Sequence, residues 1–556
     1  MRIKTPGMMP FLGSRPNYLY ETVPQKGLNG RIGHQPRGKG LGGSSAINAM
    51  VYIRGNAWDY DNWAAMGCDG WSFADVLPWF RKSEANERGE SDYHGAGGPL
   101  FVSDQKWPNE ASRAFVQSAA ALQLTETDDF NDERQAGFGI FQVTQRDGER
   151  WSASRAYVEP IRNQDNLDIR TNTLVERLIV EGGRVTGVAI RQGRRSEKIY
   201  ARRGVILSAG AFNSPQILML SGIGPGRHLN ALGVPVLLDR PAVGSNLQDH
   251  IDYVSSWEST SRVPIGNSAE GTMRMLGAML EHRRKRTGVM TTPYAEAGGF
   301  WTVGNDAPCP DVQWHFVPAM LEDHGREKVS GHGVSLHACV LRPESRGTVC
   351  LASDDPFANP AIDPNHLATE EDRRAMREAV KMVREVCQQE ALKPFTGSEI
   401  MPGPGATSDE DIDSFIRRTG ETIYHPVGTV AMGVSDTQPL DGELKVKGVE
   451  GLRVEDALRL RCERRMDGDE VRHLEQGREV HMPGMGRGEI GLGRPGAIHH
   501  VHAPAAGTPA RERRPDAAHA EDPQRLPRKV DADVLQRVPC PPRARLHELL
   551  GLPEPS

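Results

Sequence analysis

Apolar residues recur every three or four positions in "TEEDRRAMREAVKMVREVCQQ", residues 369–389, and this period predicts an amphipathic helix. Thr369 stands before a run of acidic residues, so we expect it to cap the helix. The predicted buried stripe consists of Ala375, Met376, Ala379, Val380, Met382, Val383 and Val386.

Alternating apolar and polar residues predict strands in other stretches. "NLDIRTNTLVERLIVEGGRVTGVAIRQ" (166–192) has β-rich runs on both sides of Gly182 and Gly183, which is typical of a hairpin. "PDVQWHFVPA" (310–319) and "VSLHACVLRPESRGTVCLAS" (334–353) alternate like half-buried antiparallel strands, and residues 344–347 are expected to form a hairpin loop.

A third pattern joins a strand to a helix. "YARRGVILSAGAFNSPQILMLSGIG" (200–224) predicts a short strand at 205–207, a glycine turn, and a helix with Ser214 as N-cap and Pro215 as its first residue. By contrast, "GNAWDYDNW" (55–63) predicts loop and turn. Strand-rich blocks interleaved with helices indicate an α/β core with an additional α+β region built on an antiparallel sheet.

Composition divides the 556-residue chain into two unequal parts. From Ala457 to the end there is no Phe, Trp or Tyr, while this stretch contains sixteen Arg, one Lys and twelve Pro. Such a segment buries too little apolar surface to offset its ordering entropy. We therefore expect residues 457–556 to be disordered.

Charge and cysteine content narrow the function classes. A net charge of −6 gives no global basic field, so nucleic-acid binding is not favoured. No apolar run is long enough to span a membrane. Seven scattered cysteines without a C-x-x-C pair predict reduced thiols in a cytoplasmic protein and no zinc site. Three histidines in "AIHHVH" (497–502) lie in the aromatic-free tail, and no metal site is assigned to them.

The stretch "RGKGLGGSSAINAM" (37–50) contains glycines in the spacing G-x-G-x-x-G. A dinucleotide fingerprint requires a buried strand directly before the first glycine, but "NGRIGHQPR" is polar and contains Pro36. The match to a first-strand Rossmann turn therefore fails. The loop can still hold an anion, because Ser44 and Ser45 lead into "AINAM", which is predicted to be helical. A tight structural turn is the alternative.

Four motifs in order resemble those of the glucose–methanol–choline (GMC) family of flavin-dependent alcohol oxidoreductases. They are "GKGLGGSSAINAMVYIRGNAWDYD" (38–61), "GAFNSPQILMLSGIG" (210–224), "VGSNLQDH" (243–250) and "YHPVGTVAMG" (424–433). The resemblance covers roughly residues 1–456. Within the family, the chain resembles bacterial choline dehydrogenases and FAD-dependent alcohol dehydrogenases. It implies an FAD-binding domain with an antiparallel-sheet substrate domain.

The resemblance also implies which residues serve the cofactor and the reaction. His425 is implied to be the catalytic base, a role that suits an imidazole whose pKa lies near neutral pH. Ile47 stands where some relatives tether FAD through a histidine, so FAD is expected to bind non-covalently. The implied FAD contacts are Arg37, Gly38, Leu41, Gly42, Gly43, Ser44, Asn48, Val175, Ala209, Gly210, Asp456 and Ala457.

The chain departs from the family pattern at both ends. The family's first βαβ unit, with its own glycine turn, is not found before the first motif. After "GLRVEDA" (451–457) the family's partner to the base is not found either. A reading-frame change would produce this aromatic-free, Arg-rich tail, and a genuine lineage-specific tail is the alternative. We expect residues 1–255 to form a partial FAD-binding domain with substrate-domain insertions, 256–400 a substrate-binding domain, 401–456 a return to the FAD domain, and 457–556 a non-family tail.

These features predict an enzyme that oxidises a primary alcohol, choline-like or aliphatic, to the aldehyde. The acceptor implied by the resemblance is a quinone or another non-NAD compound, and the location is cytoplasmic or peripheral to the inner membrane. Two alternatives stay open: an inactive fragment unable to retain FAD, and a non-redox lyase on the same fold. Glu296 could meet a cationic or hydroxylated substrate, although a surface carboxylate is the simpler interpretation.

Overall fold

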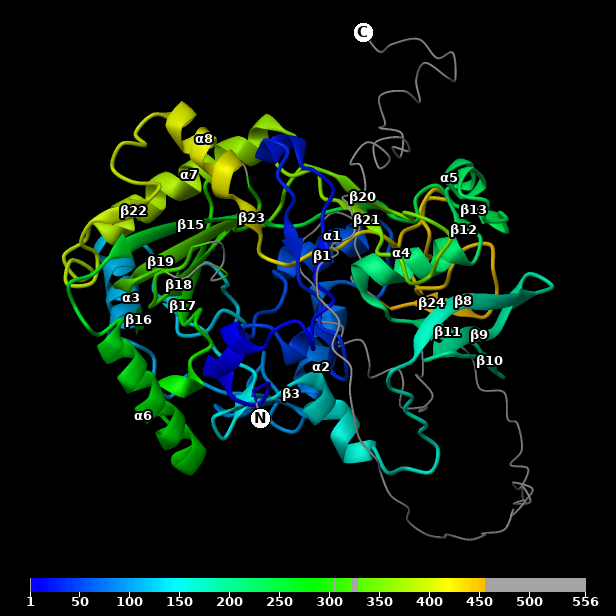
Figure 1. Cartoon of the computed structure of the whole chain (residues 1–556), viewed down its shortest axis with the longest axis horizontal. Coiled ribbons are helices and arrows are strands. Elements are labelled where there is room, and N and C mark those ends of the chain that lie inside the picture. Colours follow the sequence, from blue (N-terminus) through cyan, green and yellow to red (C-terminus); the bar gives the residue numbers. More distant parts are fainter. Residues whose placement is uncertain (1, 305–306, 323–325, 327–328, 456–556) are drawn as a thin grey trace, which may run out of the picture. The chain divides into compact units, whose positions relative to one another are not determined.

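The largest sheet has eight strands in the computed structural model, which describes residues 2–304, 307–322, 326 and 329–455 (Figure 1). Its main path runs β22-β15-β19-β18-β17-β5, with β16 paired to β19 and β23 to β15, and every pairing is antiparallel. The strands are β5 (Gly137–Ile140), β15 (Ile251–Glu258), β16 (Gly266–Asn267), β17 (Ala297–Trp301), β18 (Val312–Val317), β19 (Gly331–Val340), β22 (Glu399–Met401) and β23 (Glu421–Thr422).

Three helices cover one face of this sheet: α3 (Glu110–Ala121), α7 (Glu370–Cys387) and α8 (Asp409–Thr419). Tyr253 and Trp314 point into the apolar core between the sheet and these helices. Because side chains alternate along a strand, Asp252 and His315 lie on the opposite face. That second face carries the polar residues of the candidate site.

A second, smaller region packs around a three-stranded antiparallel sheet of β8 (Leu174–Glu181), β9 (Arg184–Gln192) and β10 (Arg195–Tyr200). Helix α4 (Gly210–Leu220) packs on β8, and the parallel pair of β11 (Val205–Leu207) and β24 (Leu452–Val454) joins the same apolar core. β24 brings the end of the described chain back to this region.

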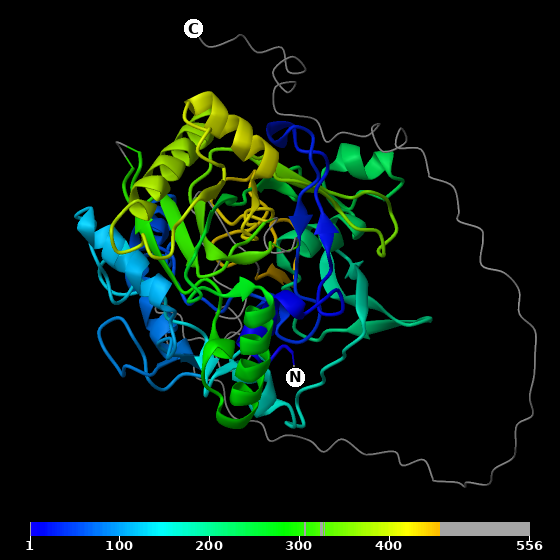
Figure 2. The same cartoon turned by 60° about the vertical axis from the view of Figure 1, so that its left-hand side comes forward.

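The remaining elements are short or lie at the periphery (Figures 1 and 2). The helices are α1 (Ala57–Ala65), α2 (Phe73–Ser83), α5 (Gly226–Ala231) and α6 (Ala269–Lys285). The short helical turns are η1 (Pro6–Phe11), η2 (Lys26–Leu28), η3 (Gly43–Ala46), η4 (Ser154–Val158), η5 (Glu159–Ile161) and η6 (Val289–Thr291). The short strands are β1 (Tyr20–Glu21), β2 (His34–Gln35), β3 (Glu84–Asn86), β4 (Leu100–Val102), β6 (Gln145–Arg146), β7 (Glu149–Arg150), β12 (Ile223–Gly224), β13 (Leu238–Asp239), β14 (Ser245–Leu247), β20 (Gly347–Cys350) and β21 (Ala361–Asp363).

Several predicted elements are confirmed. α7 begins after Thr369, whose Oγ1 accepts a hydrogen bond from the backbone N–H of Asp372 at 3.2 Å. Gly182 and Gly183 turn the β8–β9 hairpin with φ values of 58° and 82°. β18 and β19 pair antiparallel, and β11 occupies the predicted strand at 205–207. The mixed helix and sheet content matches the predicted fold class.

Other predicted elements are wrong. Residues 344–347 do not close a hairpin, because β19 belongs to the large sheet whereas β20 pairs with β14 and β21. α4 begins at Gly210, so Ser214 lies inside the helix, where its Oγ accepts a hydrogen bond from the backbone N–H of Ala209 at 3.0 Å. Residues 57–65 form α1, since Asn56 and Asp59 complete a capping box that the loop prediction overlooked.

The predicted domain boundaries stay a prediction, and β15 runs across the one at residue 255. The predicted disordered tail, 457–556, lies outside the described residues. Cys68, Cys309, Cys339 and Cys387 are free and buried, as expected of reduced thiols.

Candidate active site

The turn that carries His425 is held against residues 245–252. Gln248 and Val427 exchange backbone hydrogen bonds of 3.0 and 2.8 Å, and β23, just before the turn, pairs with the start of β15. Tyr424 has a φ of 72°, and Pro426 fixes the backbone on the other side of His425. The half-buried imidazole therefore stands on a rigid support.

Asp249 holds this turn from within. One carboxylate oxygen, Oδ1, accepts a hydrogen bond from the backbone N–H of His425 at 2.9 Å. The other, Oδ2, accepts from Thr422 Oγ1 at 2.6 Å and from Gln35 Nε2 at 3.0 Å. The side chain is 3% exposed, so these hydrogen bonds are protected from water.

His250 lies directly beside His425. Their Nδ1 atoms are 3.3 Å apart, and the rings meet edge to face with centroids 5.2 Å apart. A hydrogen bond between two such nitrogens requires one to donate and the other to accept. If His425 donates from Nδ1, its neutral ring carries no proton on Nε2, which then becomes the basic atom.

A second buried pair lies on the same polar side of the sheet. His337 Nδ1 is 2.7 Å from Asp252 Oδ2, and both side chains are buried. Burial raises the pKa of Asp252, while the neighbouring His337 and His250 act against that rise. Asp252 therefore links the His337–Asp252 pair electrostatically to the His250–His425 pair.

The glycine loop at 38–43 turns sharply into η3. Gly40, Gly42 and Gly43 have φ values of 136°, 87° and 51°, which non-glycine residues rarely adopt. A Cβ atom on Gly38 would lie 2.0 Å from the carbonyl oxygen of Gly43, so only glycine fits there. Helical structure is limited to η3, and the predicted helix over "AINAM" is wrong.

Arg37 connects this loop to two distant parts of the site. Its Nη2 donates to the carbonyl oxygen of Tyr424 at 2.7 Å. Its guanidinium carbon also lies 5.4 Å from the centre of the Phe212 ring, in the first turn of α4. The loop, the start of α4 and the His425 turn therefore meet at Arg37.

Asn48 is fixed by a buried arginine. Arg150 Nη1 donates to the Asn48 carbonyl oxygen at 2.7 Å and to Asn48 Oδ1 at 2.8 Å. Burial lowers the pKa of Arg150 to about 10, and its Nη2 has no hydrogen-bond partner among the described residues. An anionic group bound beside the loop would satisfy that donor.

The start of α4 is a second glycine turn. Gly210 has a φ of 86°, and a Cβ atom there would meet nothing within 4 Å. The N-cap residue, Ala209, offers no side-chain oxygen, so the helix begins without a side-chain cap. Val175 lies on β8, which packs beside α4.

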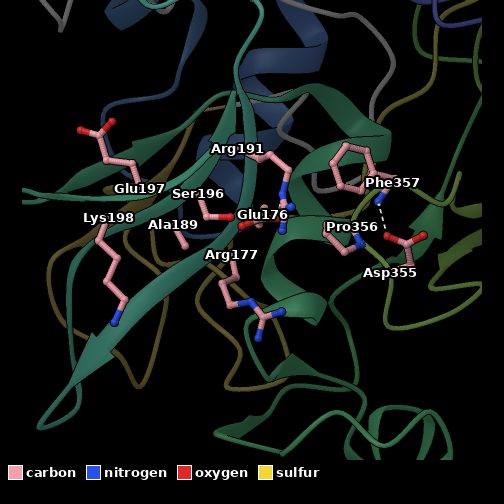
Figure 3. A pocket seen from close by; sticks show the side chains of 10 residues that line it. All are labelled: Glu176, Arg177, Ala189, Arg191, Ser196, Glu197, Lys198, Asp355, Pro356 and Phe357. Atoms are coloured by element: carbon pink, nitrogen blue, oxygen red, sulfur yellow. Dashed lines mark hydrogen bonds and ion pairs between the residues drawn. The ribbon is translucent and has the colours of Figure 1, made fainter. Parts of the chain in front are cut away.

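A pocket of about 540 Å³ opens over β8–β10, next to the position of Val175 (Figure 3). Arg191 Nε donates to Glu176 Oε1 at 2.6 Å, and the guanidinium of Arg191 lies over the exposed Phe357 ring. None of its lining residues was predicted for the site. They are Glu176, Arg177, Ala189, Arg191, Ser196, Glu197, Lys198, Asp355, Pro356 and Phe357.

Family models for GMC oxidoreductases match residues 12–252 with the N-terminal part and residues 343–457 with the C-terminal part. The chain belongs to the GMC oxidoreductase family. It is therefore an oxidoreductase, as the resemblance of its motifs implied, and FAD is its cofactor.

Similar GMC proteins include the mitochondrial choline dehydrogenase of Homo sapiens, 43% identical over 80% of this chain and 75% of the human protein. An alcohol dehydrogenase (acceptor) of Pseudomonas putida is 41% identical over 79% of this chain and 80% of that protein. Among solved structures, pyridoxine 4-oxidase from Mesorbium loti superposes with a TM-score of 0.74 at 29% identity, covering 82% of this chain and 86% of the oxidase.

The residues present fit the pyrophosphate of FAD. Both glycine turns have positive φ values, the start of α4 has no side-chain cap, and the Nη2 of Arg150 has no partner among the described residues. Backbone amides at such turns and an uncapped helix start are suited to phosphate oxygens. Arg37 adds a positive charge between them.

The predicted site residues fall into three groups. The loop residues and Asn48 lie together, and Arg37 links them to α4 and to the His425 turn. Val175 lies further along, on β8. Asp456 and Ala457 lie outside the described residues. The part each residue plays toward FAD or substrate stays a prediction.

Glu296 is not a surface carboxylate. It is 1% exposed, and its carboxylate accepts hydrogen bonds from Asn109 N–H, Ser112 Oγ and Thr292 Oγ1 at 2.6–2.7 Å. Burial raises its pKa, although these hydrogen bonds oppose the rise. It therefore ties the start of α3 to the segment that leads into β17.

Sequence reasoning missed Asp249, His250, Asp252 and His337 as site residues. The first two stand in "VGSNLQDH", where the motif was noted but no role assigned. His337 could have been found from the alternation of "VSLHACV", which places it on the same sheet face as His315 of β18. Within the described part of the chain, no group of side chains is arranged to hold a metal ion.

Proposed function

We propose that this protein oxidises a primary alcohol, choline-like or aliphatic, to the aldehyde, with His425 taking the hydroxyl proton. When bound, FAD accepts the hydride from the alcohol carbon and later yields two electrons to an acceptor. The observation that carries the proposal is the rigid turn of His425, tied through Arg37 to the glycine loop. Names of relatives, choline dehydrogenase and alcohol dehydrogenase (acceptor), support the substrate class.

The residues around His425 prepare it for this proton. Asp249 fixes the backbone of the turn from which the imidazole projects. His250, accepting from Nδ1 of His425, selects the tautomer in which Nε2 is basic. Because the turn of His425 is already held beside the glycine loop, little rearrangement of the base is needed when the alcohol binds.

The acceptor proposed is a quinone or another compound distinct from NAD. The support is the printed name of the Pseudomonas putida relative, which specifies only an acceptor. Oxygen is the rival acceptor, since a relative from Rhizobium etli, 40% identical over 81% of this chain, is an oxygen-dependent choline dehydrogenase. Oxygen consumption and quinone reduction, measured with the same alcohol, distinguish the two.

The test begins with FAD titration of the purified full chain, followed by anaerobic mixing with choline or with a long-chain alkanol. Bleaching of the flavin by either alcohol supports the proposal, and His425→Ala should slow it by about two to four powers of ten. A His425→Ala variant within threefold of the wild-type rate contradicts the assignment of the base. A chain that does not retain FAD supports the inactive-fragment alternative.

A further inference from the structure

Asp252 is a fully buried carboxylate at the start of β15, two residues after His250. The register of the sheet places it opposite Cys339 of β19 and Glu421 of β23. A carboxylate at this depth depends on hydrogen bonds or nearby positive charge, because bulk water does not solvate it. The groups that interact with it lie in two directions, toward β19 and toward the His425 turn.

His337 holds this carboxylate from β19. Its Nδ1 lies 2.7 Å from Asp252 Oδ2, and the two side chains are 8 and 0% exposed. The pairing of β15 with β19 fixes the contact, since His337 stands opposite Val254, whose side chain shares the sheet face of Asp252. An N–H that donates to a carboxylate favours the charged form of the acid. His337 therefore favours the ionised carboxylate.

In the other direction, the field of Asp252 reaches the pair of His250 and His425. Burial raises the pKa of Asp252, and the charges of His337 and His250 both oppose that rise, so the carboxylate and His250 interact. His250 Nδ1 in turn lies 3.3 Å from His425 Nδ1. His250 is 2% exposed, so water screens this interaction only weakly. A positive charge on the two imidazoles is therefore stabilised by Asp252.

Glu421, the carboxylate opposite Asp252, has cations of its own. Arg326 Nη2 and Arg31 Nη1 lie 2.6 and 3.8 Å from Glu421 Oε1. Its negative charge is therefore compensated locally. Other titratable side chains on the face of Asp252 are Cys339, His337 and, opposite His337, His315 of β18.

Asp249 and Arg37 act on the His425 turn with opposite charges. They hold the two ends of one peptide group, because Asp249 Oδ1 accepts from His425 N–H at 2.9 Å and Arg37 Nη2 donates to Tyr424 O at 2.7 Å. The fields of an anion and a cation placed in this way largely cancel. The charge of Asp252, by contrast, faces imidazoles.

We infer that Asp252 is a positioning residue of the active site, whose carboxylate stabilises the positive charge on the His250–His425 pair after His425 has taken the hydroxyl proton. In that step the O–H bond of the alcohol breaks and an N–H bond forms at Nε2 of His425, while Asp252 neither gains nor loses an atom. The catalytic part of this inference rests on the proposed function, but its electrostatic basis is measurable without turnover. A carboxylate that served only to join β15 to β19 would leave the titration of His425 unchanged.

The test is a pH titration of the full chain with FAD in excess, labelled with ¹³C at the histidine Cε1 atoms and followed by NMR. The signal of His425 is identified by its loss in His425→Gln. Asp252→Asn should lower the titration midpoint of His425 by at least about half a pH unit, because the imidazolium loses a nearby negative charge. His337→Leu should lower the midpoint too, since a buried carboxylate without its donor takes up a proton.

Asp59→Asn is the matched control, because Asp59 is a carboxylate of similar burial, 2% exposed, on α1, where Arg342 pairs with it at 2.7 Å. It should leave the midpoint of His425 at the wild-type value. An unchanged midpoint in Asp252→Asn overturns the inference, and so does an equal fall in Asp59→Asn. Should Asp252→Asn not fold, His337→Leu decides in its place. Failure of the proposed function would appear separately, as a wild-type flavin that no alcohol bleaches.

Discussion

The hydrogen bond between His250 and His425 gives the sharpest prediction about catalysis. Replacing His250 with Leu removes the acceptor for Nδ1 of His425, while His250→Gln keeps an acceptor in its amide oxygen. His250 is 2% exposed, so water does not replace a lost partner easily. A buried donor left without its acceptor costs about 1–3 kcal/mol.

That cost falls on the reactive tautomer of His425. With Nδ1–H unsatisfied, the ring prefers to carry its proton on Nε2, and the base is then blocked. At 1.36 kcal/mol for each tenfold change, a penalty of about 1–3 kcal/mol corresponds to flavin reduction that is about 5- to 150-fold slower. His250→Gln should stay within about fivefold of the wild type, because its amide oxygen can still accept.

The assay is anaerobic stopped-flow reduction of the FAD-loaded protein, followed across a pH series. The pH dependence of the reduction rate should also shift on its acid side in His250→Leu, because the neighbour of the His425 imidazole has changed. Unchanged FAD affinity and far-ultraviolet circular dichroism would show that the fold is intact. If the leucine variant reacts at the wild-type rate with the wild-type pH profile, the tautomer argument is refuted.

Two further predictions test the supports of the site, and a third concerns the buried His94 elsewhere in the fold. Asp249→Asn should lower both turnover and the thermal midpoint, because an amide cannot accept from His425 N–H, Thr422 and Gln35 together; an unchanged midpoint in differential scanning calorimetry contradicts this. Gly38→Ala should weaken FAD binding at least about tenfold in a fluorescence titration, since its Cβ would meet Gly43 O at 2.0 Å. Burial disfavours the charge on His94, but hydrogen bonds to Asp129 and Glu84 outweigh it and raise the pKa of His94 to about 9. The stabilisation, ~1–2 kcal/mol after solvent screening, should therefore be complete below pH ~6.5 and lost as the pH rises through about 9; a His94→Gln variant whose thermal midpoint follows the wild-type pH dependence would exclude it.

Local patterns predicted the elements whose signal is contained within one segment. α7 repeats its apolar stripe over 18 residues and begins with a side-chain cap, so periodicity was sufficient. The hairpin at Gly182 needed only its two glycines with positive φ. The hairpin at 344–347 failed because strand partners are chosen by the whole fold. β20 pairs with β14 and β21, which lie in other parts of the sequence.

The candidate site also combines residues that a local motif reveals with residues that only the whole fold brings together. His425 and the glycine loop carry short motifs, and both were found from the sequence. Asp249, His250 and His337 act through contacts with residues more than 80 positions away, such as the 3.3 Å approach of His250 to His425. Neither period nor composition encodes such pairs. Only the pairing of β15 with β19 and β23 brings them together.

The contacts of Arg37 indicate that the glycine loop and the His425 turn should respond to perturbation as one unit. Its backbone N–H is held by Asn17 Oδ1 at 2.9 Å, while its side chain reaches Tyr424 O at 2.7 Å, one residue before His425. A shift of the glycine loop would pull on this carbonyl, and Asp249 resists the movement from the other side through His425 N–H. Binding of a pyrophosphate at the loop would then reduce the mobility of the His425 turn. If His425 is the proposed base, its imidazole should therefore be well placed for catalysis only when the glycine loop is ordered.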